Sequence, residues 1–595
     1  MAACHAPPFL CFLAWIQPII VNQQLPSDLL SPSQLLFKKS FDFIVVGGGS
    51  AGCVVASRLS EEPNWRVLLL EAGGEEYKSA DVPGLLTYNW DTNLDWQYKT
   101  KPDEKYCGGK SCVWNSGKVL GGTSILNGMV YNRGNARSYD AWKELGNEGW
   151  GFDDVLPYFK KSENNADQDI AANTMYHSKG GPLNVQRFAF KDKNVQPLVD
   201  ALEELGYHQV DINGGNQTGV TIAQFTQKNG SRLSSNKAFL APVRKRKNLT
   251  VVTNARVVRV VMDPITKRAT GVEYVWEKFK HMGKHTIRAE KEIILSAGAI
   301  KSPQLLMLSG IGPRSVLTEK GIEVIEDLQV GQNLQDHPTS NGILLNLGDK
   351  QKSISNGLNI LREFSEYMRN NDGPLSQVGP LQVSFYIKSR YADPKIDYPD
   401  IQFFLPPVYK TKEAPGEVKS PNTQYNRIMF QPGVMMQKSR GYVTITDSNP
   451  FSDPVIVPHY FQVEDDLNVL IDAYNFIYKN LSNTKVFKGL GMALDTTPAP
   501  ECAHEKFGTE PYWICLARNL TLTLHHFSGT CKMGPRSDTS SVVDANLLVH
   551  GTKNLRVADA SIIPVLGNSN TNAPVIMIGE KAADIIKESF VVTFS

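Results

Sequence analysis

The sequence lacks the charge excess that nucleic-acid-binding proteins carry. Its 595 residues hold 62 Lys and Arg against 60 Asp and Glu, a formal net charge of +2. The longest basic run is only Arg244 to Lys247 (RKRK). A balanced charge gives no electrostatic reason to expect nucleic acid as a partner. The chain is also too long for one core, so two or three domain-sized units are expected.

No apolar run is long enough to cross a membrane. The best candidate, Phe9 to Val21, contains Gln17 and Pro18 and falls short of the roughly 20 residues that a spanning helix needs. It matches the apolar core of about 7 to 15 residues in signal peptides, although a basic leader and a clear cleavage site are missing. We expect residues 1–21 to be a signal peptide of a secreted protein without a membrane partner; a disordered tail is the alternative.

Paired CxxC motifs and clustered histidines are also missing, so the sequence gives no sign of a metal site. Of the eight cysteines, Cys4 and Cys11 lie in the candidate signal peptide. Two pairs close in sequence, 107/112 and 502/515, predict local disulfides in an oxidising compartment; unpaired thiols in a cytosolic enzyme are the alternative. Asn-x-Ser/Thr triplets agree with secretion and glycosylation. They begin at Asn216, Asn229, Asn248, Asn480 and Asn519.

What the sequence does contain is a strand, a glycine loop and a helix, starting at residue 41. Residues 41–46 (FDFIVV) are apolar, residues 47–52 (GGGSAG) form the loop, and residues 53–62 (CVVASRLSEE) place apolar side chains at helical spacing. A second apolar run, residues 66–70, completes a βαβ unit. Neither run alternates with polar residues, which is typical of a parallel sheet covered on both faces.

The loop has the GxGxxG spacing of a dinucleotide-binding turn, through Gly47, Gly49 and Gly52, with Ser50 inside it. Glycines at these positions permit a tight turn, close approach to a pyrophosphate and close packing of the helix, whose N-terminus offers free N–H groups. Glu71 follows about 20 residues later, where an acid accepts hydrogen bonds from ribose hydroxyls. The acid favours FAD or NAD over NADP, because it suits a ribose without a phosphate. Strand, helix and acid together favour a dinucleotide-binding loop over a purely structural glycine turn. The position of the loop near the start of a very long chain favours FAD.

Strand patterns return in the Val-rich stretches at 248–262 and 271–276 and at 286–298, followed by a helix pattern. Less regular stretches separate these segments. We expect an α/β chain with two interleaved domains. The predicted nucleotide-binding domain comprises residues 41–149, 226–338 and 515–588, and the substrate domain comprises residues 150–225 and 339–514.

Three further blocks resemble one family. They read GKVLGGTSILNGMVYNRG (117–134), GAIKSPQLLMLSGIGP (298–313) and VGQNLQDHP (330–338). With the glycine loop, they resemble the glucose-methanol-choline (GMC) family of FAD-dependent alcohol oxidoreductases over residues 41 to about 587. The C-terminal part looks most like the secreted insect branch, which includes glucose dehydrogenase, salicyl alcohol oxidase and ecdysone oxidase.

The resemblance implies an FAD-binding Rossmann-like βαβ domain interleaved with an α+β substrate domain, whose six-stranded antiparallel sheet roofs the substrate cavity. It also implies which residues contact FAD: Gly121, Gly122, Thr123, Asn127, Gly128, Met129, Val130, Val257, Asp559, Ala560, Asn572 and Pro574. Adjacent glycines permit close approach to a flat ring, and an amide can donate and accept at its polar edge. Some members bind FAD covalently through a histidine in GGxSxHN. Leu126 stands there, so non-covalent FAD is predicted.

Residues 524–534 (LHHFSGTCKMG) hold neighbouring histidines. In the family the base is the histidine of HxxGTC, which selects His526. Because neighbours in an extended segment point to opposite faces, His525 is expected to be a scaffold residue. The second catalytic position of the family falls on Asn570, whose amide can hydrogen-bond the substrate oxygen but cannot be a base. Cys531 is expected to be a buried apolar residue without activation as a nucleophile.

Together these assignments imply a secreted flavoenzyme that oxidises a small alcohol to an aldehyde or ketone. His526 takes the hydroxyl proton, Asn570 holds the developing oxyanion, and hydride passes to flavin N5. Electrons would then pass to O₂ or a quinone. The alternatives are a glucose dehydrogenase acting on a sugar, a lyase of the same fold, and a flavin-binding structural protein without turnover. The intact His526 and Asn570 argue against the last.

Overall fold

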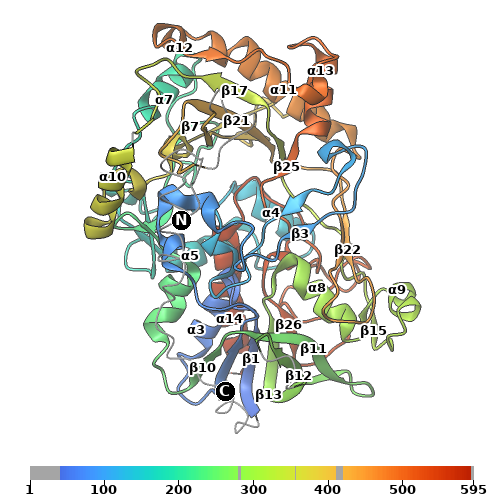
Figure 1. Ribbon diagram of the computed structural model, residues 1–595. Helices are drawn as coiled ribbons and strands as arrows, with labels where there is room; N and C mark the ends of the chain where they lie inside the picture. The colour runs from blue at the N-terminus through green and yellow to red at the C-terminus, as the bar shows by residue number, and fades with distance from the viewer. Residues whose placement is uncertain (1–39, 279–282, 356, 411–419, 591–595) are drawn as a thin grey trace, which may run out of the picture.

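The computed structural model describes residues 40–278, 283–355, 357–410 and 420–590 (Figure 1). The predicted signal peptide, with Cys4 and Cys11, lies outside the described residues. In the described part, no helix is long and apolar enough to span a membrane.

The predicted βαβ unit is confirmed. Strands β1 (Ser40–Val46) and β2 (Val67–Leu70) pair in parallel, and α3 (Ser50–Leu59) connects them. The sheet has the order β10-β2-β1-β13-β12-β11, and β26 also pairs with β13. Strands β10 (Leu249–Val252), β13 (His285–Leu295) and β26 (Leu555–Val557) extend the parallel part of this sheet. Strand β12 (Arg268–Trp276) is antiparallel to both of its neighbours, β13 and β11 (Ala255–Asp263).

Helices cover the parallel sheet, as its uniformly apolar strands require. The C-terminal helix α14 (Asn572–Phe590) packs against α3 beside the sheet (Figure 1). A glycine makes this contact close, because a Cβ at Gly579 would lie 3.0 Å from the backbone oxygen of Ala51. The last helix of the chain is thereby held against the first glycine loop.

A second sheet lies at the other end of the molecule (Figure 1). Its strands are antiparallel, in the order β24-β17-β21-β19-β18-β7, with β20 beside β21. This agrees with the antiparallel roof that the family resemblance implies, although β20 adds a seventh strand to the expected six. The strands are β7 (Gly219–Ile222), β17 (Ile343–Asn346), β18 (Val383–Ile387), β19 (Ile401–Phe404), β20 (Pro407–Val408), β21 (Arg427–Val434) and β24 (Ala493–Leu494).

Side chains alternate between the two faces of this sheet, as strand geometry requires. Phe385 and Phe403 stack at 4.2 Å on the face that carries the second hydrophobic core. Helices α7 (Val195–Glu204), α11 (Glu464–Lys479) and α13 (Glu510–Asn519) contribute to the same core. The opposite face, which includes Phe404, lines a cavity. The sheet is therefore a wall with an apolar core behind it.

The strands of each sheet come from the segments expected for each domain, although the exact boundaries stay a prediction. Helix α5 (Phe152–Ser162), which those boundaries assign to the substrate domain, packs on α14 and contributes Val155 and Phe159 to the first core. A small sheet of β5 (Glu163–Asn165), β6 (Leu183–Gln186), β8 (Phe225–Lys228) and β9 (Ser231–Arg232) follows it.

Both predicted disulfides are present, Cys107–Cys112 and Cys502–Cys515. Cys53 and Cys531 are buried free thiols. Burial raises the pKa of the Cys531 thiol well above its usual range, in keeping with an inert apolar residue.

Candidate active site

A cavity of about 990 Å³ extends from the glycine loop to the antiparallel sheet. His526, Asn570 and all but three of the predicted cofactor residues line it. The lining cofactor residues are Gly47, Gly49, Ser50, Glu71, Gly122, Thr123, Asn127, Gly128, Met129, Val130, Val257, Asp559, Ala560 and Asn572. Segments that are far apart in the sequence thus meet around one space.

The remaining three residues, Gly52, Gly121 and Pro574, support the wall from behind. A Cβ at Gly52 would lie 1.9 Å from the Gly47 carbonyl oxygen, so this glycine lets α3 pack on the loop. Gly121 has φ +95°, which the turn before Gly122 requires. Pro574 is buried in the first turn of α14.

Bare backbone faces the cavity where a cofactor needs room. A Cβ at Gly128 or Gly298 would meet no atom within 4 Å, and one at Gly49 would meet nothing closer than 3.9 Å. Gly122, at φ +56°, approaches Gly49 so closely that a Cβ would lie 2.6 Å from its Cα. Open space beside bare backbone, next to a helix N-terminus, fits the pyrophosphate and flat ring of FAD.

Glu71 stands at the end of β2, as expected for a ribose-binding acid. Its carboxylate accepts hydrogen bonds from the N–H groups of Gly48 (2.8 Å) and Gly73 (2.7 Å). Burial raises the pKa of Glu71 to about 6, so the group is ionised at pH 7. Since each carboxylate oxygen can accept more than one hydrogen bond, the side chain can also hold a ribose hydroxyl.

Asn572 and Asp559 join the C-terminal segment to this wall. The Ser50 hydroxyl donates to Asn572 Oδ1 at 2.8 Å, which connects the glycine loop to the start of α14. Asp559 accepts from Gly298 N (2.9 Å) and from the hydroxyls of Ser302 and Ser561 (2.6 Å each). These donors satisfy the buried carboxylate, which holds the start of α8 (Gly298–Leu308) in place.

His526 and Asn570 meet at the substrate end. His526 Nε2 lies 3.2 Å from Asn570 Nδ2, and the His526 side chain is only 6% exposed. Gln402 Nε2 approaches Asn570 Oδ1 at 3.5 Å, which turns the amide N–H groups of Asn570 toward the imidazole. An N–H donor here requires a lone pair on His526 Nε2. The proton of the neutral ring must then be on Nδ1.

The Nδ1–H group of His526 donates a hydrogen bond to Nδ1 of His337, a residue that sequence reasoning missed. Strand β25 (Thr521–Thr523) pairs with β16 (Pro338–Ser340), and the ladder continues from Leu524 N to the His337 carbonyl. The two Nδ1 atoms of His337 and His526 consequently lie 2.9 Å apart. His337 Nε2 has no partner of good geometry, but the backbone carbonyls of Met435 and Gly567 face the ring and favour a proton there.

Burial keeps this pair neutral. Desolvation lowers the pKa of His337 to about 3, and it lowers the pKa of His526 well below 6.5, with smaller contributions from His337 and His525. A neutral His526 at neutral pH can take a proton through Nε2, which is what a general base needs.

Asp336 holds the backbone around His526. Its fully buried carboxylate accepts hydrogen bonds from His526 N (2.8 Å), the Thr523 hydroxyl (2.5 Å) and the Tyr460 hydroxyl. Burial raises its pKa to about 6. His337 follows Asp336 directly in the sequence QDHP, but nothing in the spacing of that block indicates contact with residue 526.

The expectation that His525 and His526 point to opposite faces of an extended segment is wrong. The segment is not extended there, because His525 has φ +60°, and both histidines line the cavity. His525 instead packs edge-on against Trp90, with ring centres 5.5 Å apart, and makes no contact with Asn570. The base is therefore selected by the partners of His526 and not by opposite orientation of the two side chains.

Arg232 is a second residue that sequence reasoning missed. It is buried and donates to Asn127 Oδ1 (2.8 Å), the Asn127 carbonyl (2.7 Å) and the Ser124 carbonyl (3.1 Å). Burial lowers its pKa to about 10, so it still carries a positive charge at pH 7. A cation therefore fixes Asn127 from behind, and no local motif marks it.

Fold and cavity together define a dinucleotide-dependent oxidoreductase. Residues 41–339 match the N-terminal family model of GMC oxidoreductases, and residues 437–579 match the C-terminal model. The chain belongs to the GMC oxidoreductase family. This confirms the α/β fold class and FAD as the cofactor.

Relatives match over nearly the full chain. A glucose dehydrogenase [FAD, quinone] of Drosophila melanogaster is 39% identical, covering 99% of this chain and 94% of its own. An alcohol dehydrogenase [acceptor] of Pseudomonas putida is 36% identical, covering 92% and 95%. The crystal structure of a pyridoxine 4-oxidase from Mesorbium loti superposes with a TM-score of 0.76 at 29% identity, covering 92% of this chain and 99% of that one.

Proposed function

We propose that this protein is a secreted oxidase or dehydrogenase that converts a small, uncharged and largely apolar alcohol into an aldehyde or ketone. The observation that carries the proposal is the pair of His526 Nε2 and Asn570 Nδ2 at 3.2 Å, beneath a roof of apolar side chains. The comparisons support the reaction class, because relatives named for alcohols and for sugars match along the chain.

The chemistry follows from the two side chains. A substrate hydroxyl that replaces the Asn570 N–H at His526 Nε2 gives its proton to that lone pair, and Asn570 then donates its N–H to the oxygen as negative charge develops. His337 accepts from Nδ1 and holds the ring in the required tautomer. Bound FAD supplies the acceptor for the hydride that leaves the adjacent carbon.

The roof favours an apolar substituent on the alcohol. Gln402 and Phe404 of β19 lie on the same face as Met429 and Gln431 of β21, and Phe404 pairs with Gln431. Other cavity residues add apolar surface, namely Leu381, Pro406, Val408 and Leu524. The polar lining residues Gln431, Asn341 and Ser420 already have hydrogen-bond partners within the protein. A sugar with several hydroxyls would therefore depend mainly on Tyr409 and Asn422, which also line the cavity.

A positively charged alcohol is less suited to this end. Among the described lining residues, the carboxylates are Glu71, Asp559 and Asp91. The first two belong to the cofactor wall, and Asp91 is exposed and hydrogen-bonded to Asn115. Among the described residues, no carboxylate therefore lines the cavity beside the catalytic pair to hold a cation, since Asp336 lies behind His526 and is not part of the lining.

A sugar is the second candidate. The relative at 39% identity is named for glucose and a quinone, and Gln402, Gln431 and Asn341 could serve one or two sugar hydroxyls. The same fact keeps a quinone open as the electron acceptor beside O₂.

Secretion is supported by the two disulfides, which persist in oxidising compartments. Three of the glycosylation triplets, at Asn216, Asn229 and Asn480, begin at exposed asparagines. Asn248 is a poorer acceptor, because its Nδ2 donates to three backbone carbonyls.

The test is a substrate panel followed by flavin absorbance without oxygen. We expect benzylic and medium-chain alkyl alcohols to bleach the flavin faster, at equal concentration, than glucose or choline. Air is then readmitted: peroxide identifies O₂ as acceptor, and reoxidation only by an added quinone identifies a dehydrogenase. Faster bleaching by glucose would replace the apolar alcohol with a sugar, and no bleaching by any alcohol would overturn the reaction itself.

A further inference from the structure

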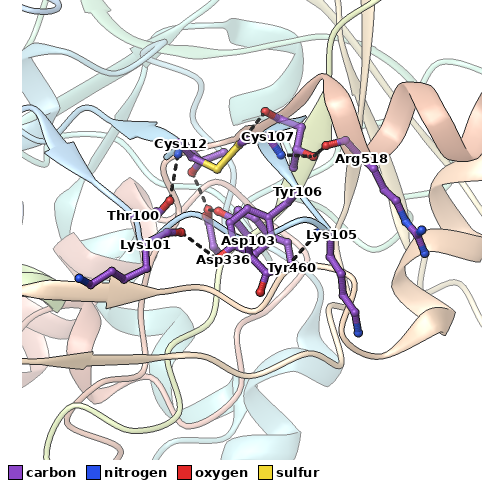
Figure 2. Close-up of a disulfide and its surroundings, with 12 residues drawn as sticks. Thr100, Lys101, Asp103, Lys105, Tyr106, Cys107, Cys112, Asp336, Tyr460 and Arg518 are labelled. Atoms are coloured by element: carbon purple, nitrogen blue, oxygen red, sulfur yellow. Dashed lines mark hydrogen bonds between the residues drawn. A yellow bond between two sulfur atoms is a disulfide. The ribbon is translucent and has the colours of Figure 1, made fainter. Parts of the chain in front are cut away.

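A disulfide-closed loop lies against the segment that carries the catalytic base. We call residues 106–112 (YCGGKSC) the strap; it joins β3 (Tyr98–Lys99) to β4 (Val113–Trp114) and is closed by Cys107–Cys112. Figure 2 shows Tyr106, Tyr460 and Asp336 close to this disulfide. The strap itself is a surface loop, because Gly108, Gly109 and Lys110 are exposed.

The first contact between strap and active-site segment is polar. The backbone N–H of Cys107 donates to the Thr521 hydroxyl at 3.2 Å, and Cys107 Sγ lies 3.3 Å from the Thr521 carbonyl oxygen. Cys112 N donates to the Thr100 hydroxyl at 2.9 Å, which fixes the other end of the loop. Thr521 is the first residue of β25, and His526 follows shortly after this strand.

The second contact is aromatic and leads to Asp336. Tyr106 packs edge-on against Tyr460, with ring centres 5.5 Å apart, and the Tyr460 hydroxyl donates to Asp336 (Figure 2). The Asp336 carboxylate in turn accepts from Thr523 and from His526 N. Strap, tyrosine and carboxylate therefore form a continuous path to the backbone of the base.

A third contact fixes the far side of the histidine. Trp114, directly after the strap, stacks on Phe527 with ring centres 4.8 Å apart and nearly parallel planes, at 4°. The β3–β4 hairpin thus contacts segment 521–527 on both sides of His526: Cys107 contacts Thr521, and Trp114 contacts Phe527.

We propose that the Cys107–Cys112 disulfide is a positioning element for His526, and that it acts through Thr521 and through Tyr106, Tyr460 and Asp336. Tyr106 is buried in the second hydrophobic core, whereas Gly108, Gly109 and Lys110 are exposed. In this exposed part the closed ring restrains the backbone, and with it Cys107 N, and it ties this part to the buried Tyr106. Displacement of a catalytic group by about 1 Å can cost 10²-fold in rate. The expected effect on the rate of flavin reduction rests on the proposed function, whereas the expected effect on the order of residues 521–528 does not.

The test compares two double variants of the holoenzyme. Cys107→Ser/Cys112→Ser opens the strap, and Cys502→Ser/Cys515→Ser opens the other disulfide, which connects η11 (Pro500–Cys502) to α13 without touching Asp336. Hydrogen exchange of backbone amides is read by mass spectrometry over residues 521–528. We expect at least tenfold faster exchange there in the strap variant, and in the control a change confined to residues 500–519.

Flavin reduction gives the functional reading. With the best alcohol of the panel and no oxygen, we expect the limiting rate of the strap variant to fall about tenfold or more with flavin content retained, and that of the control to stay within about twofold. If wild-type flavin is not reduced by any alcohol, the proposed function fails, and the exchange data alone decide the role of the strap.

Reversal separates positioning from damage. In the control variant Cys502→Ser/Cys515→Ser, a dithiol converts Cys107–Cys112 into two thiols and is itself oxidised to a cyclic disulfide. This treatment should produce the faster exchange over residues 521–528, and reoxidation should restore the exchange of the untreated control. This experiment also replaces the variant if the variant does not fold. Wild-type exchange over residues 521–528 with the strap open, or equal acceleration in the control, overturns the proposal.

Discussion

A histidine acts as a base only while one ring nitrogen keeps its lone pair, and for His526 the neighbours decide which one. Asn570 donates toward Nε2, and His337 accepts from Nδ1. The spacing HxxGTC was enough to select His526 from the sequence. It could not indicate the tautomer, because the partners of the ring lie 44 and 189 residues away.

The buried histidine pair gives stability a pH dependence. Burial lowers the pKa of His337 to about 3, whereas an unfolded histidine titrates near 6.5. Below about pH 6.5 the unfolded chain takes up a proton that the folded chain does not, so the free energy of unfolding decreases as the pH is lowered. Glu71 and Asp336 act oppositely, because burial raises their pKa to about 6, and protonation from about pH 6 to 4 favours the folded state.

The variant His337→Leu isolates the first effect. The free energy of unfolding of the wild type, relative to that of the variant, should drop by about 1.4 kcal/mol between pH 7.5 and 5.5, the linkage expected for one such histidine. Urea unfolding at the two pH values measures it. A difference that does not change with pH would mean that the pKa of His337 is the same in the folded and the unfolded protein.

At the scale of elements, the sequence pattern was sufficient to predict strands and turns whose signals lie within a short segment. The run FDFIVV, the glycine loop and the RVLLL run became β1, the loop and β2, because buried parallel strands and glycine turns have strong local signals. The antiparallel roof was expected only from the family resemblance. Strands β17 to β20 have at most five residues, the longer β21 contains Pro432 and Gly433, and their pairing depends on contacts across the chain.

One backbone detail changed the reasoning about the histidines. The expected alternation assumed extended backbone at residue 525, but Thr523 Oγ1 accepts from His525 N at 2.7 Å and the residue adopts φ +60°. A single left-handed residue that is not glycine cannot be deduced from the sequence pattern, even though histidine adopts this conformation more often than most residues.

The segment 117–134 predicts that FAD is bound without a covalent bond to the protein. Leu126 lines the cavity where a histidine would have to stand for covalent attachment, and its carbonyl accepts from Trp90 Nε1 at 2.9 Å. A carbon side chain cannot bond to the cofactor. Acid precipitation of the holoenzyme should therefore leave yellow FAD in solution and a colourless pellet; a pellet that stays yellow after washing would contradict non-covalent binding.

On the scale of the whole molecule, the interleaved domains are what create the site. The glycine loop at the start of the chain meets Asn572 near its end through Ser50, and Gln402 of the roof meets Asn570. The order of the sequence blocks implied such a meeting. The supporting groups Asp336, His337 and Arg232 could not be predicted, because a buried polar residue shows its role only when its partners are known.

The central claim is that His526, held by Asn570, His337 and Asp336, is the base of an alcohol oxidation. The most direct measurement is the limiting rate of flavin reduction by the best alcohol substrate in His526→Ala, without oxygen, with His525→Ala as the matched neighbour. We predict a loss of about 10² to 10⁴ for His526→Ala, the usual contribution of a positioned base, and a much smaller loss for His525→Ala. An unchanged rate in His526→Ala, with FAD still bound, would contradict the account.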